Sequence, residues 1–337
     1  MSKLRIYDNK KFSDLTTFRI GGPIKYYAEV KNKDEVCEAV TFARENKLKI
    51  FILGGGSDFL ASDADFDGLV VKYIGSGFKM AGDSITAEAG MEWDKLVEEV
   101  VNKNLQGVEC LSGIPGTVGA APIQNIGAYG QELSETFISL EAYDIENEKF
   151  VTFKKENCEF GYRESIFKRE DYWQKYIICS VTLKLTKNKS RKINYESLSK
   201  YIVSKNPSLS EIRKAVLKVR SEKLENPKVI GNAGSFFKNS IIDSIEKMEL
   251  ESKFSDIKIF PFGAKFKVST AWLIETAGWK GKSYRSAGVS KKHALILING
   301  TGKATAKDVF DLSKKIIDDV YKKFGIKLEP EVQFINF

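Results

Sequence analysis

One serine in this chain lies where it could donate a proton but not where it could act as an assisted nucleophile. The segment 232–239 reads NAGSFFKN and presents Ser235 after a turn of small residues. The chain holds a single histidine, His293, so the sequence disfavours a Ser-His-Asp triad. A serine without such a base is a weak nucleophile, yet its hydroxyl can still donate a proton. The alternative is a turn serine that bonds its own backbone.

Two glycine-rich segments predict loops in which backbone amides approach a ligand. The first, GGGSD at 54–58, follows a short strand predicted at 51–53. Neither the Rossmann nor the Walker pattern fits it, and the Walker pattern also fails at 300–304. The second segment, 113–130, is long, rich in Gly and Ala, and almost uncharged. These properties favour a cofactor cradle, with an ordinary structured loop as the alternative.

Charged residues beside aromatic or rigid neighbours are candidates for holding a substrate. Arg163 lies in FGYRES at 160–165, and an arginine can hold a carboxylate through two parallel hydrogen bonds. The alternative is a surface pair with the adjacent Glu164. Glu331 follows Pro330 near the end of the chain, where a solvated charge is the alternative. His293 precedes a predicted buried strand, which favours a structural role.

Composition limits the class of protein. With 337 residues, 42% of them hydrophobic, the chain can form two or three packed units. Its four cysteines lie far apart, so we expect reduced thiols and no zinc site or other metal site. No secretory signal or membrane-spanning run is predicted, so we expect a cytoplasmic protein. The net charge is +8, but bases and acids are mixed, and neither nucleic acid nor a membrane is expected as a partner.

Hydrophobic periodicity predicts helices and strands in two parts of the chain. The first part has predicted helices at 34–46, 91–103 and 211–223, predicted strands at 51–53, 69–71 and 177–185, and a polar linker or loop at 187–192. The second is a predicted α/β unit with helices near 241–250 and 269–277, a strand at 294–298, a helix opened by the capping-box pair Thr305 and Asp308, and a strand led by Pro330.

These segments together resemble the family of UDP-N-acetylenolpyruvoylglucosamine reductases, flavoenzymes that complete UDP-N-acetylmuramate in peptidoglycan synthesis. The resemblance covers nearly the whole chain. It is specific, because five unrelated short motifs recur in the same order and at the same spacing. These motifs are TTFRIGG at 16–22, LGGGS at 53–57, the loop from IPG at 114 to YG at 130, GYRES at 161–165, and NAGSFFKN at 232–239, and EPEV at 329–332 closes the chain.

The resemblance implies an α+β fold with two functional parts. A FAD-binding domain of the vanillyl-alcohol-oxidase type, built from two subdomains, is followed by a C-terminal α/β substrate-binding domain. The implied boundaries are 1–190 for the FAD-binding domain (subdomains about 1–70 and 71–190), 191–227 for a connecting loop and helix, 228–325 for the substrate-binding domain, and 326–337 for a strand that returns to the active site.

The implied activity is NADPH-dependent reduction of the enolpyruvyl double bond of UDP-N-acetyl-3-O-(1-carboxyvinyl)-glucosamine through FAD. Ser235 matches the family's proton donor to the α carbon. Arg163 and Glu331 match the pair that holds and polarises the substrate carboxylate. The chain's single histidine lies far in sequence from both glycine loops, so we expect non-covalent FAD. No metal and no required protein partner are expected.

The resemblance also assigns binding residues. For FAD they are Gly54, Gly55, Gly56, Ser57, Asp58, Ile114, Pro115, Gly116, Thr117, Gly119, Ala120, Gln124, Asn125, Gly127, Ala128, Tyr129 and Arg220. For the UDP-sugar they are Tyr162, His293, Tyr195 as a loop tyrosine over the nucleotide sugar, and Lys228 and Asn239 at the diphosphate. Three positions depart from the family pattern: Asp58 replaces the usual Asn, Ser240 the usual Pro, and Gln333 a basic residue.

Two other classes of protein share part of this pattern. An oxidase or dehydrogenase of the same flavin fold would explain the glycine loops, but not Ser235, Arg163 and Glu331 together. A basic, non-enzymatic nucleotide- or RNA-binding protein would be colourless and would not take up FAD.

Overall fold

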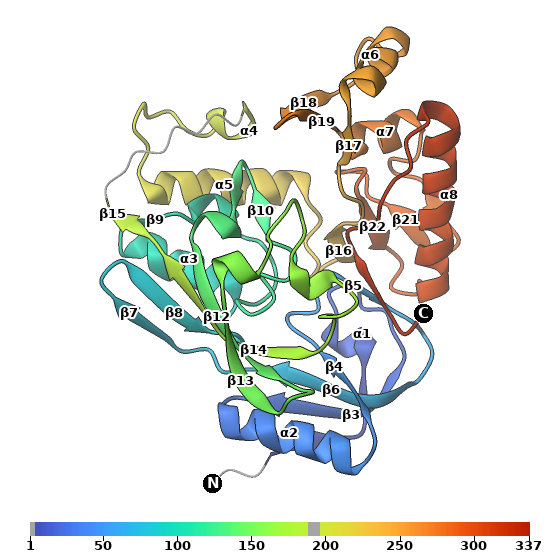
Figure 1. The fold of residues 1–337 in the computed structure, drawn as a ribbon. Helices are drawn as coiled ribbons and strands as arrows, with labels where there is room; N and C mark the ends of the chain where they lie inside the picture. The colour runs from blue at the N-terminus through green and yellow to red at the C-terminus, as the bar shows by residue number, and fades with distance from the viewer. Residues whose placement is uncertain (1–3, 188–195) are drawn as a thin grey trace. The chain divides into compact units, whose positions relative to one another are not determined.

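The computed structural model describes residues 4–187 and 196–337, which form two compact units (Figure 1). The first unit comprises Met1–Lys10, Ile24–Gly56 and Phe66–Ser221. The second comprises Lys11–Pro23, Ser57–Asp65 and Glu222–Phe337. The second unit is therefore assembled from three separate stretches of the chain, two of which lie near the N-terminus.

The first unit contains a mixed five-stranded sheet with a parallel centre. Its order is β1-β3-β6-β4, with β2 added beside β3. The helix α2 (Lys33–Glu45) connects β3 to β4 and buries an apolar face that includes Val36 and Val40. It begins where the Asn32 side chain accepts a hydrogen bond from the Glu35 amide. The strands are β1 (Ile6–Tyr7), β2 (Lys10–Lys11), β3 (Pro23–Val30), β4 (Lys49–Ile52) and β6 (Phe66–Tyr73).

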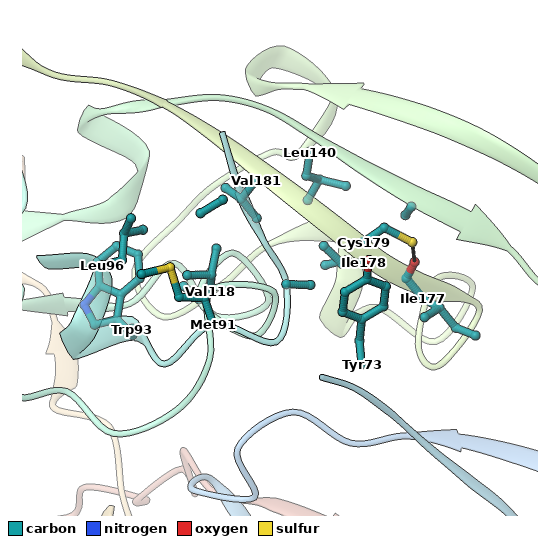
Figure 2. Packing of buried hydrophobic residues seen from close by; sticks show 14 of the residues in the cluster. Tyr73, Met91, Trp93, Leu96, Val118, Leu140, Ile177, Ile178, Cys179 and Val181 are labelled. Atoms are coloured by element: carbon teal, nitrogen blue, oxygen red, sulfur yellow. Dashed lines mark hydrogen bonds between the residues drawn. The ribbon is translucent and has the colours of Figure 1, made fainter. Parts of the chain in front are cut away.

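A second five-stranded sheet in this unit is antiparallel, in the order β13-β12-β14-β8-β7. Buried apolar side chains pack around it, and Figure 2 shows part of this core, including Trp93, Leu96 and Val181. The buried indole N–H of Trp93 donates to the Leu111 carbonyl at 3.0 Å. The elements are β7 (Phe78–Ala81), β8 (Ser84–Glu88), α3 (Trp93–Asn102), β12 (Phe137–Asp144), β13 (Lys149–Lys154) and β14 (Tyr176–Lys184).

Shorter elements complete the first unit. Two-residue strands pair as β9 with β15 and as β10 with β11. The helix α5 buries Ile212, Val216 and Val219 against Cys110. The elements are β9 (Leu105–Gln106), β10 (Gly127–Ala128), β11 (Gln131–Glu132), β15 (Thr186–Lys187), α4 (Glu196–Ser199), and α5 (Leu209–Lys223), whose last residues belong to the second unit.

The second unit contains a four-stranded sheet in the order β16-β22-β21-β20, a three-stranded sheet β17-β19-β18, and the parallel pair β23-β5. Four helices accompany them. The strands are β5 (Phe59–Ala61), β16 (Gly231–Ser235), β17 (Ser240–Ile242), β18 (Ile259–Phe262), β19 (Lys265–Val268), β20 (Ser283–Tyr284), β21 (Ala287–Val289), β22 (Ile296–Asn299) and β23 (Gln333–Ile335). The helices are α1 (Phe12–Leu15), α6 (Ser244–Lys253), α7 (Thr270–Thr276) and α8 (Ala306–Phe324).

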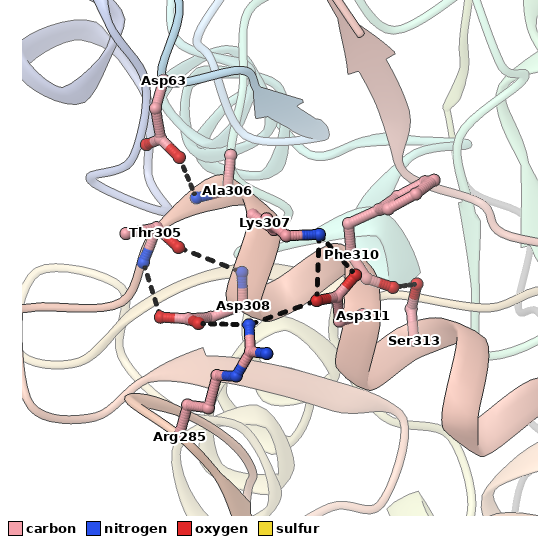
Figure 3. Close-up of polar contacts among 9 residues, drawn as sticks. All are labelled: Asp63, Arg285, Thr305, Ala306, Lys307, Asp308, Phe310, Asp311 and Ser313. Carbon is pink, nitrogen blue, oxygen red and sulfur yellow. Dashed lines mark hydrogen bonds and ion pairs between the residues drawn. The ribbon is translucent and has the colours of Figure 1, made fainter.

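The start of α8 confirms the predicted capping box. The Thr305 hydroxyl accepts from the Asp308 amide at 3.0 Å, and Asp308 accepts from the Thr305 amide at 3.2 Å (Figure 3). Asp63, which follows β5, accepts from the Ala306 amide at 2.8 Å. The first turn of α8 thus anchors the loop after β5.

One predicted element is displaced. The helix predicted near 241–250 begins later, because Ile241 and Ile242 pair with β19 as part of β17. Asp243 then caps α6 by accepting hydrogen bonds from the amides of Ile245 and Glu246. The predicted polar segment at 187–192 lies almost entirely outside the described residues.

Candidate functional site

Ser235 ends β16 in a backbone that is constrained on both sides. Gly234 has φ of 73°, a left-handed conformation that a side chain would strain. Its amide donates to the Asn232 side chain at 2.9 Å, and the Asn232 amide group donates to the Ile230 carbonyl at 2.8 Å. No hydrogen bond of the Ser235 hydroxyl is found within residues 4–187 and 196–337. The serine is therefore held by its backbone while its own donor is not used by the described part of the chain.

The TTFRIGG motif at 16–22 is hydrogen-bonded to β16. The Thr17 hydroxyl donates to the Asn232 carbonyl at 2.7 Å, and the Asn232 amide donates to the Thr17 carbonyl at 3.1 Å. A Cβ at Gly231 would come within 2.4 Å of the Phe18 carbonyl oxygen, so only glycine fits there. Arg19 donates to the Lys228 carbonyl. The motif thus fixes the segment that carries both Lys228 and Ser235.

The structure brings Glu331 next to Ser235 along the backbone. The Glu331 amide donates to the carbonyl of Phe236 at 2.8 Å, and Phe237 forms a bridge with Pro330. The rings of Phe236 and Phe237 are buried beneath this crossing. Two predicted catalytic residues from distant parts of the sequence therefore share one rigid backbone junction.

Arg163, the third predicted catalytic residue, belongs to the first unit. It adopts φ of 55° at the tip of a tight turn in which the Gly161 amide donates to the Glu164 carbonyl at 3.0 Å. Its guanidinium donates to the Gly127 carbonyl and lies 5.2 Å from the Tyr162 ring centroid. Arg163 and Tyr162 are thus held against the second glycine-rich loop, to which Gly127 belongs.

The two glycine-rich loops pack directly on each other. A Cβ at Gly55 would lie 2.7 Å from the Gly116 Cα, and a Cβ at Gly54 would lie 2.9 Å from the Ala120 side chain. No hydrogen bond of the Gly54 or Gly55 amide is found in the described part of the chain. Two side-chain-free amides beside a second loop form a cradle suited to a phosphate group.

Two buried polar groups in the first unit also fit a bound cofactor. The Gln124 side-chain oxygen is buried without a partner among the described residues. Burial lowers the pKa of Arg220, whose guanidinium lies close to where a Cβ on Gly113 would project. No hydrogen bond or ion pair of Arg220 is found within the described ranges. A ligand that carries both donors and acceptors, as FAD does, would provide a donor for the Gln124 oxygen and an acceptor for the Arg220 guanidinium.

Asp94 and Arg213 were not predicted from the sequence, yet they position the second loop. Asp94 accepts from the Gly113 amide at 2.6 Å and from both terminal nitrogens of Arg213 at 2.5 and 2.9 Å. Although burial raises the pKa of Asp94, these hydrogen bonds hold it below the ordinary value. The ionised Asp94 therefore ties α5 to the first residue of the loop. The only available signal, an Asp in a helix of the first unit and an Arg 119 residues later, is not a motif.

The predicted substrate residues of the second unit lie in different settings. Lys228 is exposed, and its amide donates to the Asn226 side chain at 2.9 Å. The Asn239 side-chain oxygen accepts from the Thr270 amide at 3.0 Å, so half of this side chain serves the start of α7. Tyr195 lies outside the described residues.

His293 has two lysine neighbours that the sequence did not suggest. Burial, followed by the charges of Lys223 and Lys280, lowers the pKa of His293, so the imidazole is neutral near pH 7. Its Nδ1 accepts from the Leu295 amide at 3.3 Å, which leaves the proton on Nε2. Glu275 acts in the opposite direction on His293 and pairs with Lys280 at 2.9 Å, so the surroundings of the neutral imidazole combine two lysines with one carboxylate.

An open hollow of about 460 Å³ includes Lys280 in its lining, together with Glu275, Gly278, Gly281 and Lys291. Gly278 and Gly281 flank Lys280 with φ of 82° and 74°. This pattern of a lysine between two glycines is the signal that could have been read from the sequence. Within the described residues no group of side chains suits a metal ion, and no helix is long and apolar enough to cross a membrane.

Comparison with known proteins gives consistent matches along the chain. Residues 224–335 match the family described as UDP-N-acetylenolpyruvoylglucosamine reductase, C-terminal domain, and residues 24–154 match the family described as FAD binding domain. The UDP-N-acetylenolpyruvoylglucosamine reductase of Amoebophilus asiaticus is 40% identical and aligns over 98% of this chain and 99% of its own length. That of Pseudomonas aeruginosa is 37% identical, over 97% and 98%.

A solved structure is similar in fold. The crystal structure of UDP-N-acetylenolpyruvylglucosamine reductase from Thermus caldophilus superposes with a TM-score of 0.72 at 24% identity, and the alignment covers 99% of this chain and 100% of that one. The predicted α+β class, with a flavin-binding fold of the vanillyl-alcohol-oxidase type, is confirmed.

Proposed function

Because this chain belongs to the family of UDP-N-acetylenolpyruvoylglucosamine reductases, FAD-dependent oxidoreductases of peptidoglycan precursor synthesis, we propose that it reduces the enolpyruvyl double bond of UDP-N-acetyl-3-O-(1-carboxyvinyl)-glucosamine. The product would be UDP-N-acetylmuramate, and NADPH would be the reductant. The observation that supports this most directly is the junction of Ser235 and Glu331. The Glu331 amide donates to the carbonyl of Phe236, the residue after Ser235, and the Ser235 hydroxyl has no hydrogen bond within the described residues.

The protein's part in the reaction is to bind, orient and protonate the substrate. The chemistry that bound FAD would supply is the relay of a hydride from NADPH to the β carbon of the double bond. Negative charge would then move through the α carbon into the substrate carboxylate, where Arg163 would stabilise it as a cation and Glu331 as a protonated, hydrogen-bond-donating acid. Ser235 would place its proton on the α carbon. A carbanion-like carbon is a far stronger base than an alkoxide, so correct placement of the hydroxyl matters more than its acidity.

The residues that would hold FAD belong to the two glycine-rich loops and to α5. The amides of Gly54 and Gly55 suit its phosphates, and Gln124 and Arg220 supply a buried acceptor and a buried cation. We expect non-covalent attachment, because the single histidine of the chain, His293, lies far in sequence from both glycine-rich loops. Acid precipitation should then release all the yellow colour into the supernatant.

The substrate's diphosphate would be bound by cations of the second unit. To the predicted Lys228 and Asn239 we add Lys223 and Lys280, whose charges act on the neutral His293; Lys280 would exchange its ion pair with Glu275 for one with the diphosphate. We assign the flavin to the 1–190 part, the connection to 191–227, the UDP-sugar to 228–325, and the closing strand to 326–337.

The absorbance spectrum of the purified protein tests this function. The spectrum should show an oxidised flavin that bleaches with NADPH under anaerobic conditions and recovers when the enolpyruvyl substrate is added. Bleaching by simple alcohols or sugars in place of NADPH, with no recovery on adding the enolpyruvyl substrate, would indicate another enzyme of the same flavin fold. A colourless protein that does not take up FAD would refute the assignment.

A further inference from the structure

Glu225 precedes β16 and contacts two segments of the second unit that carry predicted site residues. Its carboxylate accepts a hydrogen bond from the Ser290 hydroxyl at 2.7 Å, and its carbonyl accepts one from the Asn232 side chain at 3.5 Å. The Glu225 side chain is only 11% exposed, and Ser290 is fully buried. Because a buried carboxylate is costly unless it is hydrogen-bonded, the bond to Ser290 stabilises Glu225 in this place.

Ser290 fixes the turn between β21 and β22. Its amide donates to the Ile296 carbonyl at 2.8 Å, and its hydroxyl oxygen accepts from the amides of Lys292 at 3.0 Å and His293 at 3.4 Å. The Ile296 amide closes the turn by donating to the His293 carbonyl at 3.0 Å. Because the hydroxyl proton is directed to Glu225, the lone pairs of that oxygen are left for the two amides. Glu225 therefore sets the orientation of the hydroxyl on which this turn depends.

The same turn determines which nitrogen of His293 carries the proton. The Leu295 amide donates to Nδ1 at 3.3 Å, so Nδ1 is the acceptor and Nε2 bears the hydrogen. The imidazole is partly exposed, and no hydrogen bond of Nε2 is found within residues 4–187 and 196–337. The Leu295 carbonyl accepts from the Phe236 amide at 2.8 Å, which links the turn to the residue after Ser235. His293 thus offers a neutral donor that the described part of the chain does not use.

The charges near His293 indicate the class of ligand that this donor suits. After burial, the charges of Lys223 and Lys280 lower the pKa of the imidazole, while that of Glu275 acts in the opposite direction. Lys280 also lines the open hollow of the second unit. A phosphate oxygen is a charged acceptor, so it can take a hydrogen bond from Nε2 while the lysines offset its charge.

We propose that Glu225 is a positioning residue, which holds the turn 290–295 through Ser290 so that His293 donates from Nε2 to an oxygen of the substrate's diphosphate. This inference rests on the proposed function, because the diphosphate is that of the proposed substrate. It adds Glu225 and Ser290 to the residues on which substrate binding depends.

The single histidine of the chain allows a direct test, because in untagged protein every imidazole signal belongs to His293. In the NMR spectrum of the imidazole nitrogens of the FAD-loaded protein at neutral pH, Nε2 should have the shift of a protonated nitrogen and Nδ1 that of an unprotonated one. UDP should move the Nε2 signal, and uridine, which lacks phosphate, should leave it in place. A mixture of tautomers in the wild type, or an Nε2 signal that does not respond to UDP, would overturn the inference.

Variants test whether Glu225 acts through His293, with the dissociation constant of UDP measured by calorimetry. Glu225→Leu and Ser290→Ala should each raise this constant roughly tenfold, at the low end of what a hydrogen bond to a charged group contributes. Glu225→Gln should raise it at most about threefold, since its amide oxygen can still accept from Ser290. In a His293→Ala background, Glu225→Leu should cost less than about twofold, because the donor that it positions is gone. A tenfold loss in that background would contradict the positioning role.

Ser313→Ala is a matched control in the same unit. It also removes a buried hydroxyl, which donates to the Phe310 carbonyl at 2.7 Å, and UDP binding should stay normal. The melting temperature shows whether each variant is folded, and Ser290→Ala carries the comparison if Glu225→Leu does not fold. The UDP measurements need no turnover. If the enolpyruvyl substrate fails to restore the flavin colour while UDP still moves the Nε2 signal, the proposed reaction fails and the donor role of His293 stands.

Discussion

Replacing Ser235 by alanine should separate the two halves of the reaction. The Ser235 hydroxyl has no hydrogen-bond partner in the described ranges, and Asn232 and Gly234 hold the backbone. The free energy of unfolding of the variant should therefore lie within about 0.5 kcal/mol of the wild-type value. Losing a placed proton donor typically costs about 10² to 10⁴ in rate, or roughly 3 to 5 kcal/mol in the barrier. The predicted loss in rate is thus many times larger than the predicted loss in stability.

Anaerobic stopped-flow absorbance measures each half-reaction alone. Bleaching of the flavin by NADPH should be nearly normal in Ser235→Ala, and its recovery on adding substrate should be slower by two to four orders of magnitude. Ser235→Cys should regain part of the rate, because a thiol is also a donor. Ser313→Ala is a matched control: its hydroxyl is bonded within α8, to the Phe310 carbonyl at 2.7 Å, and both half-reactions should stay normal. Normal recovery in Ser235→Ala would refute the proton-donor role and restore the turn-serine interpretation.

Three further outcomes are expected. Burial and nearby lysines lower the pKa of His293, so as the pH falls below about 6.5 the histidine of the unfolded chain binds a proton before that of the folded chain does. The free energy of unfolding, measured by urea titration, should therefore decline from that pH downward, and His293→Gln should flatten the decline. Arg163→Lys keeps the charge but loses the planar fork, so it should slow recovery of the flavin colour by substrate while NADPH bleaching stays nearly normal; equal damage to both would instead indicate a role in placing the flavin. Lys280→Ala should raise KM for the UDP-sugar more than for a sugar lacking the diphosphate, and more than Lys228→Ala does, with both effects smaller at high salt; equal effects on both sugars would assign the lysine a structural role.

Local signals in the sequence predicted most of the helices. The pair of Thr305 and Asp308 marks the start of α8, because a capping box depends only on residues three apart. The displaced helix near 241–250 has the opposite cause. Ile241 and Ile242 fit a helical pattern, but pairing with β19, more than twenty residues later, makes them a strand.

The site was predictable where a motif carried the chemistry and not where distant residues meet. Ser235, Arg163 and Glu331 lie in recognisable segments. The gathering of Lys223 and Lys280 around His293 depends on tertiary packing, since the three are spread over seventy residues. The same holds for the hydrogen bond of Thr17 to Asn232, whose residues are 215 positions apart. Hydrophobic periodicity in the sequence does not predict such contacts.

The interleaved chain path of the second unit bears on how the protein is made. Lys11–Pro23 and Ser57–Asp65 are synthesised early, but their partners lie in Glu222–Phe337. The parallel strands β5 and β23 are joined across more than 270 residues, a loop that must close late in folding. During synthesis the apolar side chains of the early segments therefore stay exposed until residues 222–337 have been made, and this exposure makes the nascent chain prone to aggregation. A fragment of residues 222–337 would likewise lack two of the three stretches of the second unit. It would need both early segments to be supplied before it could recover the fold of that unit.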